Sequence, residues 1–172
     1  ILACATMEPT TGRFWFSSRG DGAHLSRFDY HTQRWDSQDG TPIQVNKKEG
    51  LNGSHVLVDV DHGFQRKRTG EDTLTQMLYA EGRRELSRQI EAAGGKVASF
   101  YTNGGHYAYV ATGRPTLVGN ITTAIGGPFD IAGMLHVTEA GGVAQGYCIH
   151  GYPDDKYRGL CDRGEDLEHA DM

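Results

Sequence analysis

The interpretation of this sequence starts from residues 127–142, which read GPFDIAGMLHVTEAGG. Apolar residues follow Asp130 at intervals of three and four, the spacing of one helix face: Ile131, Met134, Leu135 and Val137. An aspartate at a helix start accepts hydrogen bonds from the free N–H groups of the first turn, and glycine commonly ends a helix. The stretch therefore predicts a helix from Asp130 to Ala140 that Gly141 and Gly142 terminate.

Helices and strands alternate upstream of this stretch. Residues 71–93 carry apolar side chains on one helix face and end at Gly94-Gly95, and residues 106–112 form a shorter helix of small residues. Short apolar runs predict the strands, at residues 55–60, 96–101, 117–122 and 143–147. Such alternation indicates an α/β protein with layers of helices and sheet.

The first 45 residues favour strands. Residues 1–7 and 12–17 are short β-prone runs separated by turn-forming residues, so they predict a hairpin. Residues 19–23, RGDGA, predict a tight turn in which the glycines take positive φ. Residues 26–41 show no period and predict a loop, and residues 42–45 alternate as a short strand.

The segment from Pro128 to Gly133, continuing to Glu139-Ala140-Gly141-Gly142, closely resembles the signature of the inositol-monophosphatase family, Trp-Asp-x-Ala-[Ala/Gly]-Gly followed by Glu-Ala-Gly-Gly. Three more segments resemble that family in the same order: residues 12–23, 40–45 and 109–113. The resemblance spans residues 1–147 and implies the C-terminal portion of a layered α-β-α-β sugar-phosphatase-like fold, with mixed sheet and packing helices. Residues 148–172 are then expected to form an acidic, mobile tail.

The resemblance implies particular site residues. It assigns Asp130 as a catalytic residue and ligand of Mg²⁺, the expected cofactor, and a carboxylate held by helix N–H groups suits a hard oxygen ligand. The alternative is that Asp130 only caps its helix, which is worth about 1 kcal/mol. The substrate-contacting residues implied by the resemblance are Thr102, Asn103, Gly104, Gly105 and Thr123. Together they imply hydrolysis of a small phosphate ester, such as an inositol phosphate, a sugar phosphate or a nucleotide-like ester.

The departures from the family pattern are equally informative. The family takes its other metal ligands from a helical Glu and from an Asp-Pro-x-Asp-Gly-Thr motif, both preceding the strand equivalent to residues 1–7, and neither is in this chain. One carboxylate cannot organise multi-metal phosphate chemistry, so we expect this stretch alone to be inactive. Inositol-specific members place a Glu shortly before the signature, but residues 114–129 contain no acidic residue, and Asn120 or Thr123 stands near that place.

Some charged and polar residues are expected to be structural. Glu139 lies nine residues beyond Asp130, about two and a half helical turns, which favours a structural role over metal ligation. His106 is expected to pack in the core. Asp59, Asp61 and His62 lie at the end of the strand predicted over residues 55–60, where turn formation is more frequent than metal binding.

Two further interpretations stay open. One is a non-catalytic binding or oligomerisation module that keeps part of the same fold, exposes the surface of a missing layer and forms a homodimer. The other is an α/β domain whose resemblance to the family is coincidental. Because residues 1–7 form an apolar run without an initiator methionine, the chain is expected to be a piece of something longer.

Composition limits the partners. The net charge of −5 disfavours nucleic acid, and the sequence has no run of about 20 apolar residues that would span a membrane. Three cysteines without C-x-x-C spacing favour a reducing compartment, so a cytoplasmic location is expected. The expected partner is a small phosphorylated substrate.

Overall fold

A computed structural model describes residues 1–58, 73–99, 103–122 and 132–145 of the chain. Several residues singled out in the sequence lie outside this part: Asp59, Asp61, His62, Thr102, Thr123 and Asp130. The chain divides into two compact units, Ile1–Gly142 and Val143–Met172. The predicted acidic tail, residues 148–172, lies outside the described residues and stays a prediction.

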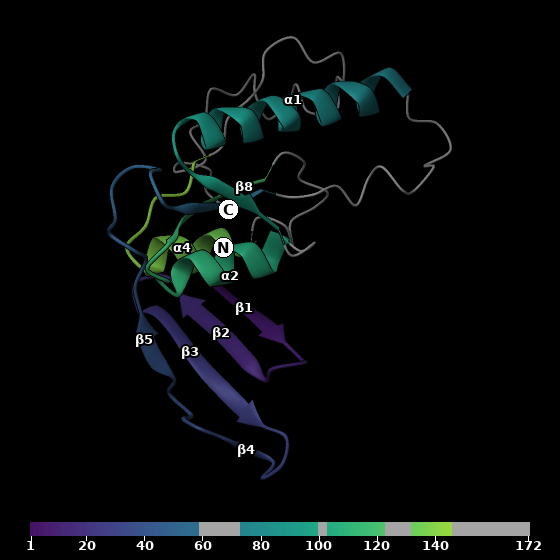
Figure 1. Ribbon diagram of the computed structural model, residues 1–172. Helices are drawn as coiled ribbons and strands as arrows, with labels where there is room; N and C mark the ends of the chain where they lie inside the picture. Colours follow the sequence, from purple (N-terminus) through teal and green to yellow (C-terminus); the bar gives the residue numbers. More distant parts are fainter. Residues whose placement is uncertain (59–72, 100–102, 123–131, 146–172) are drawn as a thin grey trace. The chain divides into compact units, whose positions relative to one another are not determined.

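The first half of the larger unit is an antiparallel sheet. Its strands are β1 (Ala3–Glu8), β2 (Arg13–Ser18), β3 (Gly22–Asp29), β4 (Arg34–Trp35) and β5 (Thr41–Ile43). The order is β1-β2-β3, and both β4 and β5 pair with β3 (Figure 1). The predicted hairpin is confirmed. Its turn requires Gly12, because φ is +72° and a Cβ there would lie 2.1 Å from the carbonyl oxygen of Phe28.

The prediction of a loop over residues 26–41 is wrong in part, since β3 continues to Asp29 and β4 lies within the range. The period was hidden because Ser26, a polar residue, is buried on this strand. Its hydroxyl donates to a carboxylate oxygen of Asp36 at 2.9 Å, which satisfies the group inside the protein. A buried serine therefore interrupts the apolar alternation that would have indicated a strand.

The second half contains a parallel sheet with the order β7-β6-β8. Its strands are β6 (His55–Val58), β7 (Lys96–Ala98) and β8 (Leu117–Ile121). Helix α1 (Thr73–Ala92) lies between β6 and β7 in the sequence, and helix α2 (Asn103–Ala111) lies between β7 and β8. The helices predicted over residues 71–93 and 106–112 and the strands predicted over residues 55–60, 96–101 and 117–122 are confirmed in their described parts, with ends that differ by a few residues.

Helices cover both faces of the parallel sheet. On one face Val56 and Val58 pack with Ile90 of α1, and on the other Leu57 and Leu117 pack with Val110 of α2. Helix α4 (Met134–Glu139) joins α2 through Val137. A cluster of alanines then connects both helices to the antiparallel sheet: Ala23, Ala111 and Ala140. Figure 1 shows α2 and α4 between the two sheets, so the predicted α-β-α-β layering is confirmed.

The end of α4 differs from one prediction. Gly141 takes φ of +81° and ends the helix as expected, but residues 143–145 form no strand, so the prediction of a last strand over residues 143–147 is wrong in its described part. The N–H of Val45 donates to the carbonyl of Ala140 at 3.0 Å. The segment after β5 therefore already occupies a place beside the end of α4, and Val143 is 74% exposed.

Candidate functional site

The carboxyl ends of β6, β7 and β8 lie at one edge of the parallel sheet, because the three strands run in the same direction. Ligands of open α/β sheets bind outside this edge. Helix α2 begins at Asn103, shortly after β7 ends at Ala98, so its first turn belongs to this edge. Gly104 has open space where a Cβ would stand, which lets a ligand approach the backbone N–H groups.

The structure brings only part of the predicted site into view. The helix predicted over residues 106–112 begins earlier, at Asn103, so Gly104 and Gly105 lie in its first turn and not in a turn before it, and their contact with a substrate stays a prediction. Thr102, Thr123 and Asp130 lie outside the described residues. Their places in the site stay predictions.

Three polar side chains meet beside this edge. The hydroxyl of Tyr107 on α2 donates to Oγ1 of Thr122 at 3.1 Å, and Nδ2 of Asn120 donates to the same oxygen at 3.1 Å. Oδ1 of Asn120 is enclosed and has no hydrogen-bond partner. Sequence reasoning named Asn120 but missed Tyr107 and Thr122. Two polar residues at alternate positions of an apolar strand were the available signal, because such residues point to the same face.

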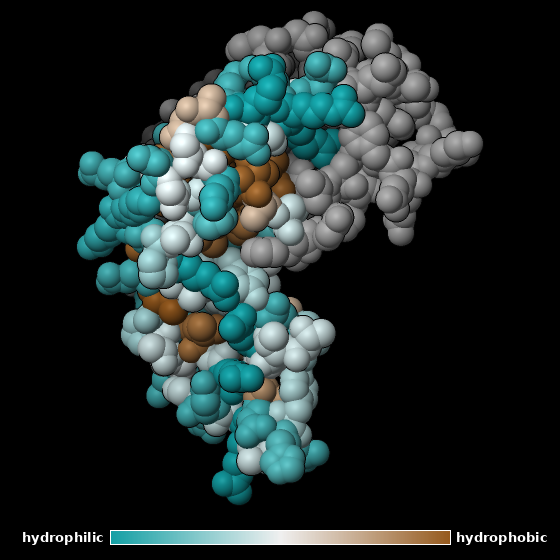
Figure 2. Space-filling model, viewed as in Figure 1, coloured by the Kyte–Doolittle hydropathy of each residue, from teal (hydrophilic) through white to brown (hydrophobic). Residues whose placement is uncertain are grey.

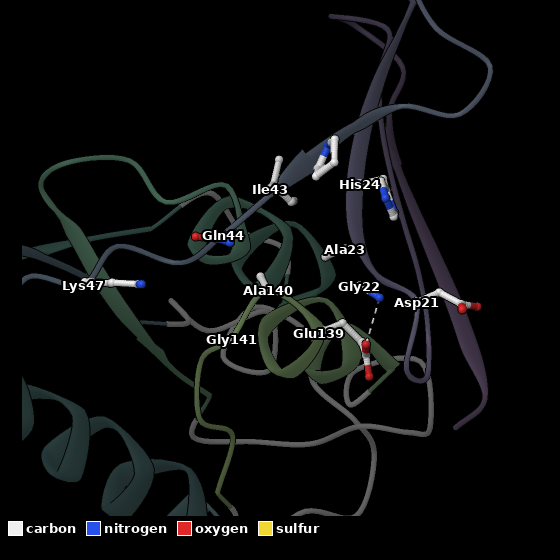
Figure 3. A pocket seen from close by; sticks show the side chains of 11 residues that line it. Asp21, Gly22, Ala23, His24, Ile43, Gln44, Lys47, Glu139, Ala140 and Gly141 are labelled. Atoms are coloured by element: carbon white, nitrogen blue, oxygen red, sulfur yellow. Dashed lines mark hydrogen bonds between the residues drawn. The ribbon is translucent and has the colours of Figure 1, made fainter.

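Glu139 is a structural residue, as expected. Its Oε2 accepts hydrogen bonds from the N–H groups of Gly20 and Gly22, both at 3.1 Å. Figure 3 shows the bond to Gly22. Both glycines take φ of +85°, so the turn between β2 and β3 presents its N–H groups to the end of α4. The turn at residues 19–23 and Glu139 both belong to segments that resemble the inositol-monophosphatase family in sequence, and these hydrogen bonds join them.

A pocket opens beside this contact, between the β2–β3 turn, β5 and the end of α4. Figure 3 shows Lys47 and Gln44 on one side of it, and His24 and Asp21 on the other. Its lining comes from segments other than those that form the carboxyl edge of the parallel sheet. One oxygen of Glu139 already accepts the hydrogen bonds of the β2–β3 turn. We therefore assign this pocket no part in chemistry at the carboxyl edge of the parallel sheet.

The interface between α4 and the antiparallel sheet contains a buried histidine. Nδ1 of His136 lies 2.7 Å from Oγ of Ser17, and Nε2 lies 3.1 Å from Oγ1 of Thr6. Burial lowers the pKa of His136 to about 4 and raises the pKa of the neighbouring Cys4 thiol to about 11. Both groups are therefore neutral near pH 7. A buried histidine and a protonated thiol suit packing rather than nucleophilic catalysis. His106 is also fully buried, as expected for a core residue.

The described residues do not fit a metal ion. No group of three or more His, Cys, Asp or Glu side chains is arranged to hold one within residues 1–58, 73–99, 103–122 and 132–145. Asp130, the predicted ligand, lies outside these ranges. The same part of the chain contains no helix that is long and apolar enough to cross a membrane.

Neither a protein-family model nor a curated protein matches the sequence. Solved structures do match the fold. The extragenic suppressor protein SuhB from Bartonella henselae aligns with 82% of this chain at 22% identity and a TM-score of 0.52. The IMPase of Thermotoga maritima aligns with 81% at 19% identity, also with a TM-score of 0.52.

These matches place the chain in the class of layered α/β proteins with a phosphatase-like fold. More particularly, its fold is the inositol-monophosphatase fold, and the resemblance seen in the sequence is confirmed at that level. The chain corresponds to 43% of SuhB and 42% of the Thermotoga protein, so it spans about two fifths of the length of those structures.

Proposed function

We propose that this chain forms the C-terminal part of a phosphomonoesterase that hydrolyses a small phosphate ester. The observation that carries the proposal is the open, glycine-containing first turn of α2, at the carboxyl edge of a parallel sheet in a chain with the inositol-monophosphatase fold. The IMPase of Thermotoga maritima, by its name, is an inositol monophosphatase. Backbone N–H groups at a helix start bind phosphate oxygens, which suits an ester at this edge.

In this proposal the turn from Thr102 to Gly105 contacts the substrate, Thr123 lies beside it, and Asp130 is the catalytic carboxylate. Mg²⁺ is the proposed cofactor and Asp130 its ligand in this chain. Within the described residues no group of three or more His, Cys, Asp or Glu side chains could hold the ion, so a complete set of ligands would need residues outside them. A cytoplasmic location is proposed on the odd number of cysteines without C-x-x-C spacing.

The test uses the full-length polypeptide that contains these 172 residues. Phosphate release from inositol 1-phosphate, glucose 6-phosphate and fructose 1,6-bisphosphate is measured with Mg²⁺. We expect Asp130→Asn to lower kcat/KM by at least about a hundredfold, because an amide is a poor Mg²⁺ ligand. Asp39→Asn, at an exposed residue of the loop before β5, is the matched control and should leave the rate unchanged. An unmodified protein that releases no phosphate from these esters contradicts the proposal.

A second candidate function is a module that associates with another copy of itself. The face of the antiparallel sheet opposite α2 and α4 carries a row of aromatic rings. Successive centroids along the row lie 5.1–5.7 Å apart, in the order His24, Phe16, Phe14, Trp35, Phe28 and Tyr30. Met7 and Trp35 on this face are 43% and 42% exposed. An apolar sheet face of this kind is suited to burial against a partner.

This second candidate predicts a homodimer. Sedimentation at concentrations of tens of micromolar should give twice the monomer mass, and Trp35→Lys should give a monomer because it places a charge in the interface. Arg84→Glu, on the exposed side of α1, is the control. A monomeric unmodified protein over this range argues against the module.

A further inference from the structure

The pocket between the β2–β3 turn, β5 and the end of α4 has no role in the proposed reaction. Its volume of about 450 Å³ lies within the range of pockets that bind small molecules. All the residues that line it belong to the described part of one compact unit, Ile1–Gly142. The pocket is therefore large enough and complete enough to be considered as a binding site in its own right.

The walls of this pocket are held in place by packing within the protein. Ala23 and Ala140 are buried against each other's neighbourhood in one core cluster. The N–H of Val45 donates to the carbonyl of Ala140 at 3.0 Å, which joins the segment after β5 to the end of α4. His24 stacks on Phe16, with ring centroids 5.3 Å apart and ring planes at 18°. A pocket formed in advance loses little conformational entropy when a ligand binds.

One side of the pocket presents oxygen acceptors. Oε2 of Glu139 accepts the hydrogen bonds of the β2–β3 turn, whereas its Oε1 and its main-chain carbonyl oxygen have no hydrogen-bond partner among the described residues. Asp21 adds a second carboxylate to the lining on this side. An ammonium group has three hydrogens to donate and no acceptor, so it matches this side of the pocket.

The opposite side of the pocket presents donors. Figure 3 shows Lys47 and Gln44 there, across the pocket from Glu139. Within the part of the chain that the structure describes, the ammonium group of Lys47 makes neither an ion pair nor a hydrogen bond. The adjacent Lys48, by contrast, donates from Nζ to the carbonyl of Asn52 at 2.8 Å. An unpaired ammonium group beside an amide is suited to bind a carboxylate.

The surface between these two sides is apolar. Pro42 and Ile43 of β5 line the pocket there, and Figure 2 shows apolar surface over β5 among hydrophilic atoms. An anion without a positive group would meet the carboxylate of Glu139, and a cation without a negative group would meet Lys47. A ligand with an ammonium group at one end, a carboxylate at the other and methylene groups between them complements the whole lining.

We propose that this pocket is a second binding site, separate from the carboxyl edge of the parallel sheet, for a small linear zwitterion of the ω-amino-acid class. Glu139 binds the ammonium group of this ligand, Lys47 binds its carboxylate, and Ile43 contacts its methylene groups. The site goes beyond the proposed phosphomonoesterase function and does not depend on it. Because Glu139 also holds the β2–β3 turn against α4, a bound ligand stabilises the folded protein.

The test measures binding to the full-length protein by calorimetry, with 4-aminobutyrate and 6-aminohexanoate as the probes. We expect at least one of them to bind with a Kd of about 1 mM, since an open pocket supplies two charge-assisted hydrogen bonds. The matching compounds that lack one charged end are butyrate, butylamine, hexanoate and hexylamine. They should bind at least about tenfold more weakly, because each loses one of these hydrogen bonds.

Two variants assign the charged ends of the ligand. Lys47→Gln should weaken binding of the zwitterion at least about tenfold, because it removes the charge that faces the carboxylate. Glu139→Gln should weaken it by a similar factor, while its amide oxygen remains an acceptor for the β2–β3 turn. Lys48→Gln is the matched control for Lys47, since Lys48 does not line the pocket, and it should leave the Kd unchanged.

Several results would overturn this inference. One is the absence of calorimetric binding by both probes at concentrations up to about 20 mM. Another is equal binding of 6-aminohexanoate and hexanoate, and a third is an equal loss of affinity in Lys47→Gln and Lys48→Gln. If Glu139→Gln does not fold, Lys47→Gln and the singly charged compounds decide the outcome. Phosphate release is not measured in this test, so failure of the proposed function would leave its result unaffected.

Discussion

Two polar clusters on opposite sides of the α2–α4 layer differ in how completely they are satisfied. Towards the antiparallel sheet, both ring nitrogens of His136 have hydroxyl partners, on Ser17 and Thr6. Towards the parallel sheet, Asn120 keeps an enclosed oxygen without a partner. A closed network, whose groups are all paired, stabilises packing, whereas an open one, in which a buried acceptor has no partner, lowers stability unless something else satisfies that acceptor. The difference between the two clusters shows that buried polar side chains are not by themselves evidence of a ligand-binding site.

The largest effect we expect concerns acid stability. The pKa of His136 is about 4 in the folded protein, against about 6.5 for an unperturbed histidine, so the unfolded chain binds more protons between these values. The contribution of His136 to the free energy of unfolding should therefore be constant above pH 6.5. It should lower that free energy by roughly 3 kcal/mol as the pH drops to 4. Urea titrations over this range measure the fall.

The matched variant for this experiment is His136→Gln, because glutamine can donate and accept hydrogen bonds but does not titrate. The free energy of unfolding of this variant should not show the fall between pH 6.5 and pH 4 that the protonation of His136 causes in the unmodified protein. Cys4 does not titrate in this range, since its thiol pKa is about 11. A variant with the same pH profile as the unmodified protein would contradict the assignment to His136.

A smaller effect is expected from Ser17→Ala in the closed network. The change removes the hydroxyl 2.7 Å from Nδ1 of His136 and leaves this buried ring nitrogen with only the weaker contact to Sγ of Cys4 at 3.4 Å. The free energy of unfolding at pH 7 should fall by about 1–3 kcal/mol. Ser18→Ala, in the same strand but with an exposed hydrogen bond to Asp21, should change stability by less than about 0.5 kcal/mol. Equal effects of the two substitutions would show that the His136 network adds little.

The smallest expected effect is in the open network. Asn120→Leu removes an amide whose oxygen has no partner, so we expect the melting temperature to stay within a few degrees of the unmodified value or to rise slightly. Thermal unfolding by circular dichroism measures it. The comparison between the two networks fails if Asn120→Leu destabilises the protein as much as Ser17→Ala.

Most of the helices and strands could be predicted from local sequence. The hairpin around Gly12, helices α1 and α2, and the glycine that ends α4 follow from turn chemistry and apolar spacing, which adjacent residues encode. The errors fell where that spacing misleads. A buried polar residue, Ser26, interrupts the alternation of β3, and its hydroxyl bonds to Asp36. Residues 143–145, whose sequence predicted part of a strand, form none.

The site divides in the same way. The sequence by itself determined the family-like signature, the glycines at the start of α2 and the polar residues of β8, because these are properties of short segments. Only the tertiary structure decided that Glu139 holds the turn at Gly20 and Gly22, that His136 faces Ser17, and that Thr122 meets Tyr107. Glu139 and Gly20 are 119 positions apart, as are His136 and Ser17. Such pairs form only when the layers pack against one another, because packing rather than local preference sets which faces meet.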